Sequence, residues 1–374
     1  MDPAPFLQDF FMNDMTKPPQ YFPTKYWHKL DDDRIQCDIC PNACKLKEGQ
    51  HGVCFVRMRH DNQVVLTTYG RASGVCIDPV EKKPLFHFLP GTPVLSFGTI
   101  GCNLSCKFCQ NLDISKSTLM ERLTEIAMPE TIAETAAKYN CKSVAFTYTE
   151  PVTFFEYAID TAKACHKRGI KTIAVTNGYV CKESAKEFFS HMDAATIGLK
   201  GFTEDFYHRV TGAHLQPILD TLRYLKKETN VWVEIAYLII PGESDSMSEL
   251  DLATKWFVGN LDQDIPVHFN AFYPAWKMLD KSPTPKETLT QAREIAKKNS
   301  LRHVYIGNVA AYEDGNTFCH NCGKCVIERD NYIITDYQLT DEGNCKFCDT
   351  KCAGVFRGPA GTWGTKQQQV FFPK

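Results

Sequence analysis

Short β-branched runs alternate with amphipathic stretches through the middle of the chain. Seven of these runs have the length and composition of buried strands, and the stretches between them predict helices. Alternation of this kind is typical of repeated βα units around a parallel sheet, which can close into a full or partial barrel. The predicted strands are Val94–Phe97, Ser143–Thr147, Ile170–Val175, Ala195–Leu199, Val231–Ile239, Val267–Phe272 and Val304–Ile306.

Proline and glycine set the limits of three of the predicted helices. Pro129 precedes the periodic stretch TIAETAAKY, and Thr284-Pro285 precedes KETLTQAREIAKK. Proline is tolerated in a first helical turn, where its missing N–H has no partner to lose. Gly169 follows FFEYAIDTAKACHKR and predicts the end of that helix.

Length and charge narrow the class of protein. At 374 residues with a formal net charge of −2, the chain exceeds one small domain. It shows no basic run, which argues against nucleic-acid binding. The N-terminal MDPAPFLQDFFMNDM has acidic rather than basic residues, and no apolar run approaches the ~18 residues of a membrane span. We therefore expect a cytoplasmic protein with no membrane contact.

The 17 cysteines fall into clusters with the spacing of metal ligands. With no export signal, metal sites in a reducing compartment fit better than disulfides. Four cysteines stand alone, and isolated cysteines of this kind are usually small buried apolar residues. They are Cys76, Cys141, Cys165 and Cys181.

The segment GCNLSCKFCQN sets Cys102, Cys106 and Cys109 at C-x3-C-x2-C spacing, directly after the first predicted strand. Thiolates hold iron–sulfur clusters, and a cubane has four irons to ligate. Three cysteines leave one iron open to an exogenous ligand. The alternatives are a zinc knuckle or three inert thiols, but a structural zinc requires four ligands and no fourth lies close by.

This loop, with the aromatic Phe108 before its last cysteine, resembles the signature loop of radical S-adenosylmethionine (SAM) enzymes. Together with IDPVEKKPLFHFLPG (Ile77 to Gly91) and VYIGNV (Val304 to Val309), it resembles the radical SAM member of the AmmeMemoRadiSam system, a relative of the pyruvate formate-lyase activating enzymes. The resemblance runs from about Cys37 to about Phe356. It implies a partial (β/α)6 TIM-like barrel, with SAM on the open iron of a 4Fe–4S cluster.

The same resemblance implies SAM contacts at the ends of the second and third strands. The family carries Gly-Gly-Glu-Pro where this chain has Tyr-Thr-Glu-Pro, so Glu150 matches a residue that meets the SAM amino group. Thr176 and Asn177 match a segment that contacts the methionyl or ribose part. Without that resemblance, Glu150 reads as an acidic helix cap and Thr176-Asn177 as a turn.

Two further candidates lie on later strands. Lys200 matches the lysine of the activating enzymes' Asp-x-Lys pattern, which implies a cation near the SAM carboxylate or sulfonium region, whereas Gly198 stands in place of the aspartate. The alternative for Lys200 is a solvated surface lysine. His268 is a minor candidate for cofactor binding, because a lone histidine on a strand is more often structural. The same segment offers Asn270 and Tyr273.

Two cysteine clusters flank the core. The first, Cys37, Cys40, Cys44 and Cys54, has four thiolates, enough for a closed zinc site or an all-cysteine cubane, and the sequence leaves both open. In the second, two C-x2-C pairs flank a predicted hairpin, VIERDNYIITDYQL, as in a zinc ribbon. Its expected zinc ligands are Cys319, Cys322, Cys345 and Cys348, while the additional Cys325 and Cys352 would allow an auxiliary iron–sulfur cluster instead.

We therefore expect three parts: an N-terminal cysteine-bearing module (1–90), a radical SAM core (91–310), and a C-terminal metal ribbon with a tail (311–374). The resemblance implies an oxidoreductase that cleaves SAM to a 5′-deoxyadenosyl radical, which abstracts hydrogen from a small molecule or peptide. The alternatives are a glycyl-radical enzyme activase and a non-catalytic metal scaffold or redox sensor. The expected partners are an electron donor such as flavodoxin or ferredoxin and proteins of the AmmeMemoRadiSam system.

Overall fold

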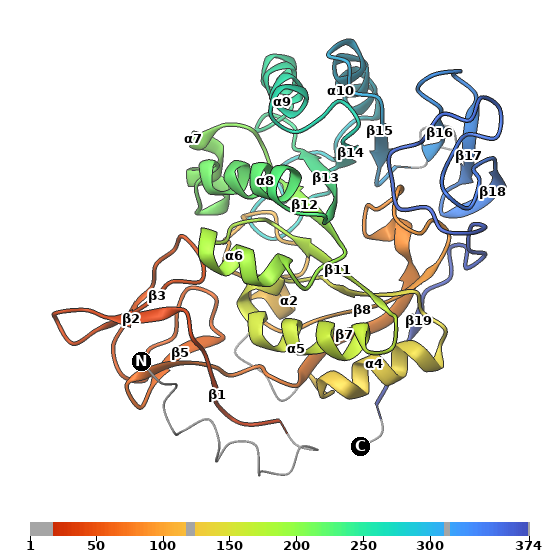
Figure 1. Ribbon diagram of the computed structural model, residues 1–374. Coiled ribbons are helices and arrows are strands. Elements are labelled where there is room, and N and C mark those ends of the chain that lie inside the picture. Colours follow the sequence, from red (N-terminus) through yellow and green to blue (C-terminus); the bar gives the residue numbers. More distant parts are fainter. Residues whose placement is uncertain (1–17, 117–123, 310–314, 373–374) are drawn as a thin grey trace.

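A ten-stranded sheet forms the centre of the computed structural model, which describes residues 18–116, 124–309 and 315–372 (Figure 1). Seven neighbouring strands of this sheet run parallel, in sequence order. They are β8 (Pro93–Gly98), β10 (Ser143–Phe146), β11 (Lys171–Thr176), β12 (Ala194–Leu199), β13 (Trp232–Ile239), β14 (Val267–Ala271) and β15 (Val304–Gly307).

These are the seven strands that the hydrophobic pattern predicts, each within about two residues at its ends. Every residue of β10 is buried, as expected for a strand covered on both faces. The sheet stays open, because β8 and β15 do not pair with each other. The partial barrel is therefore confirmed, with one more parallel strand than the six that the resemblance implies.

Helices follow the strands and lie along the outside of the sheet (Figure 1). The three with predicted limits are all present, and α4 begins at its proline. The longer helices are α4 (Pro129–Lys138), α5 (Phe155–His166), α6 (Lys182–Phe189), α8 (Gln216–Glu228), α9 (Met247–Asn260) and α10 (Lys286–Lys298). Shorter ones are α2 (Leu112–Ser115), α7 (Glu204–Phe206) and the single turns η2 (Val80–Lys82), η3 (Pro151–Phe154) and η4 (Tyr207–Thr211).

One long strand was absent from the predicted set. β7 (Arg71–Pro79) pairs antiparallel with β8, and β19 (Gln368–Gln369) and β9 (Glu125–Ile126) pair with β7. A bulge lies between Ser73 and Cys76, and Gly74 there has φ of 66°. The bulge breaks the two-residue alternation that identifies a half-buried strand.

Small sheets flank the barrel on opposite sides (Figure 1). On the N-terminal side are β1 (Phe22–Pro23), β5 (Arg57–His60) and β6 (Gln63–Leu66) in one sheet, and β2 (Trp27–Lys29), β3 (Ile35–Cys37) and β4 (Lys45–Leu46) in another. On the C-terminal side are β16 (Thr317–Phe318), β17 (Cys325–Asp330) and β18 (Ile333–Tyr337). The last two form the predicted antiparallel hairpin.

The three-part division of the chain stays a prediction. The central sheet includes β7 from the first predicted part and β19 from the last, and the expected border at 310 lies outside the described residues. The N-terminal stretch MDPAPFLQDFFMNDM also lies outside them. Among the helices of the described segments, none is long and apolar enough to cross a membrane.

Candidate active site

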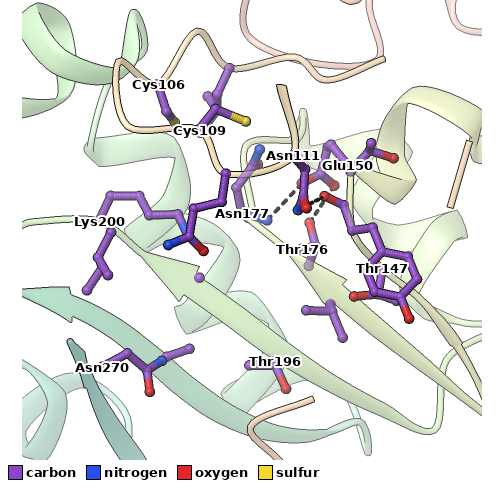
Figure 2. A pocket seen from close by; sticks show the side chains of 18 of the residues that line it. Cys106, Cys109, Asn111, Thr147, Glu150, Thr176, Asn177, Thr196, Lys200 and Asn270 are labelled. Carbon is purple, nitrogen blue, oxygen red and sulfur yellow. Dashed lines mark hydrogen bonds between the residues drawn. The ribbon is translucent and has the colours of Figure 1, made fainter. Parts of the chain in front are cut away.

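A pocket of about 400 Å³ lies at the carboxyl ends of the parallel strands, where barrel proteins place their chemistry. The signature cysteines form part of its lining, and residues from the ends of β10, β11, β12 and β14 form much of the rest (Figure 2). Seven of the eight residues predicted for catalysis and cofactor binding line it. They are Cys102, Cys106, Cys109, Glu150, Thr176, Asn177 and Lys200.

Backbone hydrogen bonds hold the signature loop against the barrel. The N–H groups of Ser105 and Lys107 donate to the carbonyls of Thr211 and Val210, at 2.8 and 3.0 Å. Burial raises the pKa of the Cys106 thiol to about 11. The loop is thus anchored on both sides of this cysteine.

The three thiols fit a multi-iron cluster better than a single ion. They share one pocket, yet their sulfur atoms do not come within 4.8 Å of one another as a set. Four thiolates around one zinc lie closer, since a Zn–S bond of about 2.3 Å sets sulfurs about 3.8 Å apart in a tetrahedron. In a cubane each cysteine binds a different iron, which separates the sulfurs further. Cys102, Cys106 and Cys109 would hold such a cluster, with room for another ligand in the adjoining pocket.

Glu150 ties the end of β10 to the end of β11. Its Oε1 accepts a hydrogen bond from the Thr176 hydroxyl at 2.6 Å and one from the Val152 N–H at 3.1 Å, and its Oε2 accepts one from the Asn177 N–H at 2.8 Å (Figure 2). Burial raises the pKa of Glu150 to about 7, although these hydrogen bonds act to lower it. The carboxylate therefore organises the pocket wall, and one lone pair, on Oε2, remains for a ligand.

Asn177 continues this network to the signature loop. Its side-chain amide donates to Asn103 Oδ1 at 2.8 Å, and Asn103 donates in turn to the Tyr179 carbonyl at 2.8 Å. Asn103 directly follows Cys102 in the chain. Through these contacts, Glu150 and the cysteine loop share one buried polar framework.

The Lys200 ammonium points into the pocket from the end of β12 (Figure 2). A Cβ at position 198 would lie 3.0 Å from Lys200 Nζ, so an aspartate there would contact this ammonium. Because position 198 is glycine, no such carboxylate is present beside Lys200. The ammonium is thus positioned to meet an anionic group of a ligand.

Tyr148 is a pocket residue that the sequence reasoning did not identify. It has φ of 68°, a left-handed conformation that glycine adopts without steric cost, at the position where the resembling family has its first glycine. Its hydroxyl contacts Cys76 Sγ at 2.8 Å and donates to Asp78 Oδ2 at 3.1 Å. Lys83 Nζ donates to the same Asp78 oxygen at 2.7 Å.

The only signal for this cluster was the IDPVEKKPLFHFLPG stretch, which supported the family resemblance but no role in the site. Asp78 and Lys83 lie in that stretch, and Lys83 lines the pocket. Asn111 was missed as well. Its side chain donates to the Tyr148 carbonyl at 2.6 Å, which joins the cysteine loop to the end of β10 (Figure 2).

His268 does not lie with the other predicted cofactor contacts. It and the pocket residue Asn270 are two positions apart on β14 and share a face, but His268 lies deeper, about 6–7 Å toward the amino end of the strand. There it is 2% exposed, bonds to Glu234 Oε2 at 2.7 Å and stacks on Tyr305 with ring centroids 5.0 Å apart. The structural alternative describes it better than cofactor binding does.

The expected C-terminal zinc ligands come together in the ribbon. The ligand atoms of Cys319, Cys322, Cys345 and Cys348 all lie within 4.8 Å of one another. The Cys319–Cys348 and Cys322–Cys345 sulfur distances are 3.6 and 3.8 Å. This spacing matches one tetrahedral ion, and it leaves out the additional Cys325 and Cys352.

The N-terminal cysteines come together as well, in a place of their own. Cys37, Cys40, Cys44 and Cys54 all line a small cavity separate from the main pocket. As in the signature loop, no three of their sulfur atoms lie within 4.8 Å of one another.

Comparison with known proteins agrees with this geometry. Residues 97–252 match the radical SAM superfamily. The chain is 40% identical over 327 residues to the uncharacterized protein MJ0808 of Methanocaldococcus jannaschii, covering 87% of this chain and 97% of that protein. It is 25% identical over 221 residues to the pyruvate formate-lyase 1-activating enzyme of Escherichia coli, covering 55% of this chain and 89% of that enzyme. The chain therefore belongs to one family with MJ0808, and its core is a radical SAM domain homologous to the glycyl-radical enzyme activating enzymes.

Proposed function

We propose that this protein reductively cleaves SAM and directs the resulting radical to a small-molecule or peptide substrate. One observation carries the proposal: the three signature cysteines and the strand-end residues Glu150 and Lys200 line the same pocket. A closed metal site would need no such room beside it. A non-catalytic scaffold or redox sensor would not require cysteines and ligand-binding groups to converge on one pocket.

The chain's own residues supply binding and orientation. Lys200 meets the carboxylate of SAM, and the remaining lone pair of Glu150 accepts from the SAM ammonium. The hydrogen bonds from Thr176 and Asn177 keep the Glu150 carboxylate in place. When bound, the cluster and SAM supply the electron transfer that breaks a sulfonium C–S bond, and the protein keeps the site oriented and dry.

Glycyl-radical enzyme activation is the second candidate, and the homology to the E. coli activating enzyme favours it. Against it stands Gly198, which removes the aspartate of the activase pattern beside Lys200. The two extra cysteine modules also favour a small-molecule or peptide substrate. We propose that the substrate is handled jointly with proteins of the AmmeMemoRadiSam system, and that flavodoxin or ferredoxin supplies the electrons.

We also propose zinc at the C-terminal ribbon. Its four sulfurs have the separation of ligands around one ion, which supports zinc over a cluster that includes Cys325 or Cys352. A ribbon with so small a core gains much of its folding free energy from such a metal.

The proposed function is tested by anaerobic reconstitution of the full chain with iron and sulfide, followed by SAM and a strong reductant. We expect 5′-deoxyadenosine to form, uncoupled from substrate but detectable. A preparation with a complete signature cluster that never cleaves SAM would contradict the proposal and favour the scaffold.

Cys106→Ala and Cys141→Ala make a matched pair for this experiment. Cys106 lines the pocket, whereas Cys141 is 4% exposed and outside it. Cys106→Ala should lose cluster absorbance and SAM cleavage together, because the remaining two thiols cannot hold the cluster. Cys141→Ala should retain both.

A further inference from the structure

Four cysteines converge on one small cavity beneath the N-terminal hairpins. Cys37 ends β3, Cys40 and Cys44 lie in the loop that leads to β4, and Cys54 precedes β5. The Cys37 and Cys54 side chains are buried, at 7% and 8% exposure. Ile39 and Leu46 also line the cavity and shield it from water.

The separation of the sulfur atoms distinguishes this quartet from the ribbon quartet. The ribbon sulfurs have the spacing of ligands to one ion, whereas no three of the N-terminal sulfurs lie within 4.8 Å of one another. The three signature sulfurs are likewise not all within 4.8 Å of one another. Four thiolates, each bound to a different iron, describe a cluster with no open position.

The groups around the quartet suit a negatively charged centre. The Val53 N–H donates to Cys44 Sγ at 3.5 Å, and Arg57, 2% exposed and paired with Glu156, also lines the cavity. Gly52 packs closely here, since a Cβ at that position would lie 3.3 Å from Cys44 Sγ. A thiolate cluster would gain the hydrogen bond from Val53, and it would share the charge of Arg57 with Glu156.

The quartet cavity and the SAM pocket share a wall. Asn103 lines the quartet cavity, while its chain neighbours Cys102 and Leu104 line the pocket. The Asn42 side chain, from the loop between Cys40 and Cys44, donates to the Asn103 carbonyl at 2.7 Å. A short path of covalent bonds and one hydrogen bond thus joins a quartet ligand to a signature ligand.

We propose that Cys37, Cys40, Cys44 and Cys54 hold a second 4Fe–4S cluster that delivers electrons to the signature cluster. This inference rests on the proposed function. A reduced flavodoxin or ferredoxin gives one electron to the quartet cluster, which passes from the 2+ to the 1+ state. It returns to 2+ when it passes that electron to the signature cluster, which is reduced from 2+ to 1+ in turn.

Iron and zinc counts on the reconstituted full chain test the cluster. Two cubanes require about eight iron atoms per chain, and the ribbon requires one zinc. We expect Cys40→Ala to lose about four irons, and Cys106→Ala to lose the other four. Cys181→Ala is the matched control, because the Cys181 N–H donates to the Ile39 carbonyl beside the quartet but its thiol does not line the cavity.

The wild-type count decides the question even where a variant folds poorly. Four irons with two zincs, or four irons and four titratable thiols at the quartet, would overturn the second cluster. Eight irons without SAM cleavage would contradict the proposed function and leave this cluster standing. Four irons with SAM cleavage would support the proposed function and overturn the second cluster.

The relay is tested by the ratio of two rates of 5′-deoxyadenosine formation, one driven by reduced flavodoxin and one by dithionite. Normalising to dithionite removes any general loss of activity in a variant. The ratio should fall at least tenfold in Cys40→Ala and stay at the wild-type value in Cys181→Ala. An unchanged ratio in Cys40→Ala would overturn the relay.

Discussion

The side chains at the strand ends differ in how many hydrogen bonds they make within the protein. Glu150 accepts hydrogen bonds from three donors, whereas Lys200 presents its ammonium to the pocket. Glu150→Ala should weaken SAM binding by about 1.5–3 kcal/mol, since it removes a charged acceptor for the SAM ammonium. Lys200→Ala should weaken SAM binding by the same amount or less. The dissociation constant of SAM, measured anaerobically at equal cluster content, checks both.

The melting temperature separates the two roles. Glu150→Ala should lower it, because the Thr176 hydroxyl and the Asn177 N–H lose their acceptor. Lys200→Ala should leave it near the wild-type value. Unchanged SAM affinity in both variants would show that these residues are ordinary caps and turns.

Glu81 makes stability depend on pH. Burial raises its pKa from 4.5 to about 7, and its Oε2 has no hydrogen-bond partner within the described segments. The folded state then holds the proton more tightly than the unfolded state. Glu81 therefore contributes most below pH 4.5, and this contribution is lost as pH rises toward 7.

Glu81→Gln should remove that pH dependence, because the amide stays neutral. Relative to wild type, we expect its free energy of unfolding to rise by roughly 1–3 kcal/mol between pH 5 and pH 8. Denaturant unfolding at the two pH values measures the difference. Glu342→Gln, at an exposed position, is the control and should show no such rise. A difference that is the same at both pH values would contradict this prediction.

At the scale of elements, the C-terminal ribbon depends on its metal. The hairpin of β17 and β18 buries only a small core that includes Val326, Ile327 and Leu339. Cys322→Ser should lose one zinc per chain and lower the thermal stability of the ribbon. Cys325→Ser should keep the zinc, because Cys325 lies outside the four-sulfur group. Iron and sulfide in place of zinc would overturn the assignment and favour an electron-relay or substrate-anchoring role.

At the scale of the whole molecule, a buried ion pair joins the N-terminal hairpins to the barrel. Arg57 of β5 contacts Glu156 of α5 through two hydrogen bonds, of 3.2 and 2.6 Å. Glu156→Ala should cost about 3–5 kcal/mol in the free energy of unfolding, because it leaves a buried guanidinium without its counter-ion. Glu183→Ala removes the partner of the exposed Lys186 and should cost under about 1 kcal/mol. Equal losses in the two variants would show that the buried pair does not join these parts.

Features that depend on residues close together in the sequence were predictable from the sequence alone. The seven parallel strands follow from β-branched runs, because a buried strand needs several consecutive apolar residues. The ribbon hairpin and the signature loop are also local, since ligands three or four residues apart meet with little help from the rest of the chain. Residue order then implied that Glu150, Thr176, Asn177 and Lys200 share a rim, because parallel strands present their carboxyl ends at one edge.

Only the tertiary structure decided how deeply a side chain is buried and which residues far apart in the sequence come into contact. His268 and Asn270 look alike in a two-residue alternation, yet the packing of Glu234 and Tyr305 places the first in the core and the second at the pocket. Cys76 meets Tyr148 across 72 positions of sequence, and no local pattern encodes that pairing. The two flanking cysteine quartets likewise offer the same number of thiols, and only the folded backbone sets the distances between their sulfurs, on which the choice between one ion and a cluster depends.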